Sequence, residues 1–140
     1  MIQPWASLFV LGETEFETRT WKTNYRGRLV IHTSKKVDKS ACRHPKVQEL
    51  LGKHGESVES LPTGQIIGVC SLLNCIKVIE TGSGMAVLED GRVITGTELL
   101  LGDYRIGSYA WEVEGMRLLD EFVPAKGQLG VWEYGGDFLL

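Results

Sequence analysis

Glu17, Arg19 and Trp21 place an acid, a guanidinium and an indole at alternate positions near the N-terminus. If this stretch is extended, alternate side chains share one face of the strand, so all three point the same way. A carboxylate accepts from an exocyclic amine, a guanidinium donates to carbonyl or phosphate oxygens, and an indole stacks on a flat ring. The spacing therefore predicts a surface that binds something flat and polar. A same-face ion pair of purely structural value is the alternative interpretation.

Positive charge is concentrated around these residues. Residues 17–54 hold ten of the fifteen Lys and Arg but three of the eighteen Asp and Glu, which gives +7 there and −10 elsewhere. A one-sided positive field suits a polyanion, or phosphate on a smaller ligand, whereas basic residues scattered over a solvated surface are the alternative. We expect Trp5 to offer a second stacking surface. We expect turn residues Tyr25 and Arg26 to close over a ligand, and Arg28, Lys35 and Lys36 to contact phosphates.

The hydrophobic pattern indicates which elements position these side chains. Helical spacing predicts short helices over residues 4–11 and 40–54, and β-forming runs predict strands over 15–21, 28–33, 65–79, 108–118 and 130–134. Asp90-Gly91 predicts a hairpin between 85–88 and 92–94, whereas 98–101 fits helix or strand. Gly68 suggests a bulge or bend, and Trp111 and Trp132 are expected in the core. The pattern predicts an α+β fold, a small mixed β-barrel with a few flanking short helices.

Length and composition narrow the class of protein. With 140 residues we expect a single domain over 1–140. No apolar run approaches the roughly 20 residues of a membrane span, and the start MIQPWASLFVLG does not resemble a signal peptide, so we expect a cytoplasmic protein without a membrane partner. Cys42, Cys70 and Cys75 form no CxxC pair, so we expect reduced thiols, no metal and no cofactor. The sequence leaves the oligomeric state open.

The segments QPWASL, GETEFETR and WKTNYRGRLVIHTSKK together resemble the ASCH domain, a β-barrel family of the PUA-like superfamily with the hallmark G-x-K-x-x-E-x-R. GVCSLLNC, DYRIGSYAWEVEGMRLL and PAKGQLGVWEY are similar to its later strands. The resemblance implies that Gly12, Glu17 and Arg19 are the hallmark glycine, glutamate and arginine. It also implies that they line a cleft at the barrel mouth that holds RNA or a nucleotide. Thr14 stands where the hallmark has lysine, and we count it among the ligand-binding candidates.

Three hypotheses follow from these residues, and the third is an accessory module that interacts with another protein. The leading one is an RNA- or nucleotide-binding domain that recognises a base and phosphates in that cleft. The alternative is a hydrolase acting on RNA or on a modified nucleoside, similar to small ASCH enzymes that remove the acetyl group from N4-acetylcytidine. Those enzymes resemble this chain but have lysine at the place of Thr14 and threonine at the place of Glu17. Because both positions differ, the catalytic residues stay unknown, and Glu17 is the candidate base for activating a water.

Overall fold

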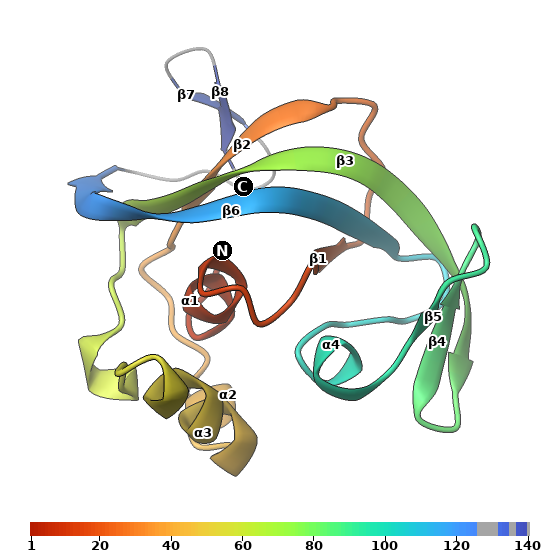
Figure 1. Cartoon of the computed structure of the whole chain (residues 1–140), viewed down its shortest axis with the longest axis horizontal. Coiled ribbons are helices and arrows are strands. Elements are labelled where there is room, and N and C mark those ends of the chain that lie inside the picture. The colour runs from red at the N-terminus through yellow and green to blue at the C-terminus, as the bar shows by residue number, and fades with distance from the viewer. Residues whose placement is uncertain (126–131, 135–136, 140) are drawn as a thin grey trace. The chain divides into compact units, whose positions relative to one another are not determined.

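The computed structural model describes residues 1–125, 132–134 and 137–139, with side chains described for 1–125 (Figure 1). The helices are α1 (Trp5–Val10), α2 (Lys39–Cys42), α3 (Pro45–Lys53) and α4 (Gly96–Leu100), with a 3-10 turn at Val58–Ser60. The strands are β1 (Phe16–Arg19), β2 (Gly27–His32), β3 (Gln65–Gly82), β4 (Met85–Leu88), β5 (Val93–Ile94), β6 (Tyr109–Pro124), β7 (Trp132–Tyr134) and β8 (Asp137–Leu139). None of the helices in this part of the chain is long and apolar enough to span a bilayer.

The strands form one mixed sheet in the order β1-β6-β3-β2-β8-β7, with β4 pairing with β3 and β5 with β4. Figure 1 shows β3 and β6 as the two long neighbouring strands. β1 runs antiparallel to β6, and β2 runs parallel to β8. The α+β class with a few short helices is confirmed. Closure into a barrel is not found, because among the described strands the order has two ends, β1 and β7.

The chain divides into two compact units. The first comprises Met1–Gly12, Arg28–Cys70 and Met116–Leu140, and the second comprises Glu13–Gly27 and Ser71–Gly115. β3 and β6 each contribute residues to both units. The single domain over residues 1–140 therefore stays a prediction.

In the first unit, the predicted helix over 40–54 is two helices. α2 begins after Asp38, whose carboxylate accepts the backbone N–H of Ala41, and α3 begins with Pro45 at its first position. His44 has φ −68° and ψ 126°, an extended conformation, because a residue before proline is disfavoured in the α region. Pro45 thus divides the predicted helix into two.

Gly68 of β3 is a close-packing position, and its φ lies outside the left-handed region that favours glycine. A Cβ at this position would lie 2.7 Å from Val10 Cγ1 and 3.1 Å from the carbonyl oxygen of Arg117. These distances leave no room for a methyl group, since interiors pack as densely as organic crystals. The glycine therefore lets α1 lie directly against β3 inside the first unit.

The second unit has its own hydrophobic core. Phe16 of β1 packs with buried residues of β3, the β4–β5 hairpin, the segment between α4 and β6, and β6, namely Val78, Ala86, Leu88, Ile94, Tyr104 and Ala110. The predicted hairpin is confirmed, and Gly91 has φ +93°, the left-handed conformation that glycine tolerates best. α4 follows β5 and resolves the ambiguous segment as a helix.

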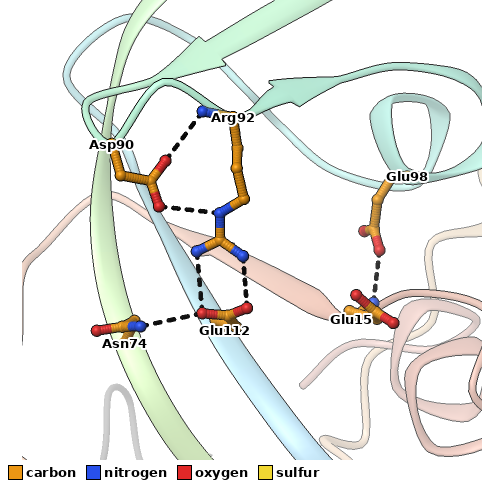
Figure 2. A network of polar contacts seen from close by, with 6 residues as sticks. All are labelled: Glu15, Asn74, Asp90, Arg92, Glu98 and Glu112. Atoms are coloured by element: carbon orange, nitrogen blue, oxygen red, sulfur yellow. Dashed lines mark hydrogen bonds and ion pairs between the residues drawn. The ribbon is translucent and has the colours of Figure 1, made fainter.

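A polar network fixes the hairpin to the long strands (Figure 2). Arg92 donates from both terminal nitrogens to the Glu112 carboxylate, at 2.5 and 3.0 Å, and from Nε to Asp90 at 2.9 Å. Asn74 donates to the same carboxylate at 3.1 Å, and the guanidinium lies 5.2 Å from the centroid of the Phe16 ring. Glu112 pairs with Phe16 in the register of β6 and β1, so this network anchors the strand that carries Glu17.

Candidate functional site

Glu17 and Arg19 lie on β1, and Trp21 follows two residues after the strand ends. Arg19 Nη2 is 3.6 Å from Glu17 Oε2, and its guanidinium carbon lies 5.3 Å from the centroid of the Trp21 ring. The side chains of Arg19 and Glu17 are 21% and 16% exposed, whereas Trp21 is 37% exposed. The structure therefore brings the acid, the guanidinium and the indole together, as their spacing predicted.

Trp111 supports this arrangement from the neighbouring strand. It pairs with Glu17 in the β1–β6 register and is completely buried, which confirms the prediction that it is a core residue. Its indole N–H donates to the carbonyl oxygen of Trp21 at 3.2 Å, and the two rings meet edge to face with centroids 5.7 Å apart. Such contacts fix the direction of an aromatic side chain. Trp21 is thus held in place while part of its surface stays open to solvent.

The Glu17–Arg19 pair leaves hydrogen-bonding capacity unused. Arg19 Nε is buried and has no hydrogen-bond partner in the structure. Burial raises the pKa of the Glu17 carboxyl, although the charge of Arg19 acts in the opposite direction. A buried, unsatisfied polar atom costs roughly 1–3 kcal/mol, which a ligand with suitable polar atoms would recover. The Glu17–Arg19 ion pair therefore leaves one buried donor of Arg19 without a partner, and a ligand role for the pair stays a prediction.

The other candidates of the second unit lie before and after β1. Thr14 precedes the strand and is partly buried. Arg26 is exposed, and its Nη1 donates to the carbonyl oxygens of Thr23 and Tyr25 at 3.0 and 2.8 Å. The Tyr25 backbone N–H donates to the hydroxyl of Thr23. Part of the Arg26 guanidinium thus shapes its own loop, and a ligand role for Arg26 and Tyr25 stays a prediction.

Four candidates belong to the first unit. Trp5 is the first residue of α1 and is partly buried, whereas Arg28 of β2 is exposed. Lys35 and Lys36 are also exposed, in the segment between β2 and α2. Their ammonium groups are open to an anionic partner, and their role stays a prediction.

Sequence reasoning missed two polar residues of the second unit, Tyr104 and Glu98. Tyr104 is 5% exposed, and its hydroxyl interacts with the Glu98 carboxyl, which adds to the effect of burial in raising the pKa of Tyr104. No periodic pattern marks either residue. Among the described residues, no group of three or more His, Cys, Asp or Glu side chains is placed to hold a metal ion. The side chain of Trp132, the other expected core tryptophan, lies outside the described residues.

Together, the mixed sheet with short helices and the acid–guanidinium–indole cluster at the end of β1 define a small α+β fold with a polar and aromatic cluster on one strand. The ASCH domain family model matches residues 1–120, so this chain belongs to the ASCH domain family. The match includes Gly12, Glu17 and Arg19. It also includes Thr14, which departs from the hallmark.

The chain is also similar to part of a larger protein. "Activating signal cointegrator 1" of Homo sapiens is 36% identical over 78 residues, which are 54% of this chain and 13% of that protein. The Mus musculus protein of the same name is 36% identical over 87 residues, 55% of this chain and 14% of that protein. The chain therefore matches only a small part of the length of these relatives.

Proposed function

We propose that this ASCH domain binds RNA, with a base stacked on the open surface of Trp21 and its polar edge held by Glu17 and Arg19. The observation that carries the proposal is the geometry around Arg19. Its guanidinium lies over a fixed, 37% exposed indole, and its Nε has no partner in the protein. Stacking on an aromatic ring and edge recognition by polar side chains are how proteins bind unpaired RNA bases. In this proposal the cleft implied by the family resemblance is formed around these residues.

The exposed Lys35 and Lys36 contribute phosphate contacts in this proposal. Their charges supply an affinity that does not depend on sequence and weakens with salt. Base recognition then depends on the second unit alone.

The test is fluorescence anisotropy with a labelled single-stranded RNA of mixed sequence. Trp21→Ala should weaken binding about 5- to 150-fold, because a stacked base is worth roughly 1–3 kcal/mol. Phe122→Ala is the matched control, since Phe122 is also 37% exposed and lies in the first unit. Equal affinities of the two variants and the wild type would refute the proposed site.

A hydrolase remains the second candidate function, and one observation favours it. The Glu17 carboxyl has a pKa raised by burial and lies beside a cation. A carboxylate with a pKa closer to neutrality is a stronger base for taking a proton from an attacking water, and Arg19 would stabilise the oxyanion that forms on an acyl carbon. Turnover of acylated nucleosides or RNA that is abolished in Glu17→Gln would establish this function. Absence of turnover in the wild type would dismiss it.

A further inference from the structure

β1 is supported on one face by residues 96–104, which comprise α4 and part of the loop that follows it and which we call the backing segment. Thr18 Oγ1 accepts the backbone N–H of Asp103 at 2.9 Å. Because side chains alternate along a strand, Thr18 lies on the face of β1 that is opposite to Glu17 and Arg19. The backing segment therefore contacts β1 from the face that does not carry the candidate site.

The side chain of Glu98 fixes the point at which β1 begins. Glu98 Oε1 accepts the backbone N–H of Glu15 at 2.5 Å, as Figure 2 shows. The carbonyl oxygen of Glu15 accepts the backbone N–H of Val113 of β6 at 3.0 Å. The backbone is thus held from two elements, α4 and β6, one residue before the strand starts.

The backing segment is itself held in place by the core of the second unit. Leu99 of α4 packs against the buried cluster to which Tyr104 belongs. The Tyr104 hydroxyl interacts with the Glu98 carboxyl, so the side chain that binds the start of β1 also has a buried partner. Side chains that are fixed in this way are suited to hold the residues of a binding site in a defined position.

β1 needs this support because it is a short strand at the edge of the sheet. It has four residues, lies at one end of the strand order and, among the described strands, pairs with β6 alone. A change in its register by one residue would turn Glu17 and Arg19 to the other face. The bonds at Glu15 and Thr18 lie on either side of Glu17 and oppose such a displacement.

We infer that Glu98 is a positioning residue of the candidate site, because its carboxylate holds β1 so that the side chains of Glu17, Arg19 and Trp21 meet. Thr18 has the same role on the other side of Glu17. This inference goes beyond the proposed RNA binding, since it concerns how the protein forms the site before any ligand arrives. Only its effect on RNA affinity rests on the proposed function.

Amide hydrogen exchange of the full chain without RNA, followed by mass spectrometry, tests the position of β1. Glu98→Ala removes the acceptor of the Glu15 N–H, so peptides that cover residues 13–20 should exchange about 3- to 10-fold faster, as expected for the loss of one hydrogen bond. Glu98→Gln keeps an oxygen for this N–H and should exchange like the wild type. Wild-type exchange of these peptides in Glu98→Ala would overturn the inference, whether or not the protein binds RNA.

RNA affinity shows whether this support reaches the site. At a temperature at which thermal melting shows every variant to be folded, Glu98→Ala should weaken binding of single-stranded RNA about 3- to 10-fold, and Glu98→Gln should restore it. Gly68→Ala is the control, because it is expected to lower stability from the first unit without changing the affinity.

Thr18→Val is a second variant that keeps the shape of the side chain and removes only the acceptor of the Asp103 N–H, so it tests the inference even if Glu98→Ala unfolds. It should also weaken RNA binding. Wild-type affinity in both Glu98→Ala and Thr18→Val would refute a positioning role and leave RNA binding intact. Absence of binding by the wild type would instead refute the proposed function, and hydrogen exchange would then decide the inference alone.

Discussion

Removing the charge of Glu112 should lower the free energy of unfolding, and the contacts of this side chain allow us to estimate by how much. Glu112→Gln keeps the shape of a side chain that is 17% exposed but weakens its paired bonds to Arg92 and its bond from Asn74. Hydrogen bonds to charged groups contribute roughly 1.5–3 kcal/mol, and solvent screening at the 40% exposed Arg92 reduces this value. We expect a loss of about 1–2 kcal/mol in the free energy of unfolding.

The assay is thermal unfolding followed by circular dichroism. For a chain of this size the loss corresponds to a decrease in Tm of about 3–8 °C. Asp103→Asn is the matched control, because the Asp103–Arg105 pair has side chains that are 62% and 69% exposed. The control should leave Tm unchanged. Equal Tm values for the two variants would refute the assignment of the Glu112 network as a stabilising anchor.

The pH dependence of the stability difference between the wild type and Glu112→Gln gives an independent check. The hydrogen bonds from Arg92 lower the pKa of Glu112 from its ordinary value of 4.5, against the effect of partial burial. A carboxyl with a lowered pKa in the folded state adds stability above its unfolded pKa, and this stability is lost as the pH falls toward the folded value. The gap between the wild type and Glu112→Gln should therefore narrow below about pH 4.5. A gap that stays constant into this acid range would contradict the explanation.

Three further predictions follow. Gly68→Ala should lower the free energy of unfolding by about 1–3 kcal/mol, because the added methyl group overpacks against α1. Gly52→Ala in α3 is the control, which should be neutral or stabilising because nothing lies within 4 Å of the added group. Urea unfolding of the two variants distinguishes these outcomes. If Lys36 contacts phosphate, Lys36→Glu should weaken RNA binding and reduce the slope of log affinity against log salt concentration. Lys77→Glu, at another exposed lysine, is the control and should change neither the affinity nor the slope. Because burial raises the pKa of Glu17 above its ordinary value of 4.5, the stability of Glu17→Gln relative to the wild type should increase as the pH rises above about 4.5. A difference in urea unfolding that does not change with pH would contradict this.

Local patterns predicted the elements that carry the site. Alternation around Phe16 predicted β1, and the Asp90-Gly91 pair predicted the hairpin. Helical spacing over residues 4–11 predicted α1, which is followed by Gly12 with φ +86°. Each of these signals lies within a few residues of the element that it specifies. The spacing of Glu17, Arg19 and Trp21 is also a local signal. The sequence alone therefore predicted that these three side chains lie together.

Features that depend on distant residues were not predictable in this way. Trp111 was recognised as a core residue, but its position opposite Glu17 depends on the β1–β6 register. Glu98 and Asp103 bond to Glu15 and Thr18, at or beside β1, across more than eighty residues of sequence. The closed barrel was expected from strand number and family resemblance, whereas the open order depends on which strands pair. Pairing across the chain is set by tertiary packing, which periodicity does not encode.

Ultraviolet cross-linking locates the proposed contact between RNA and the residues at the end of β1 most directly. The full chain is irradiated in complex with a single-stranded RNA of mixed sequence, and the cross-linked peptides are sequenced by mass spectrometry. We expect a cross-link at Trp21 that is lost in competition with excess unlabelled RNA. Cross-links confined to other parts of the chain, with none between Glu13 and Gly27, would contradict it.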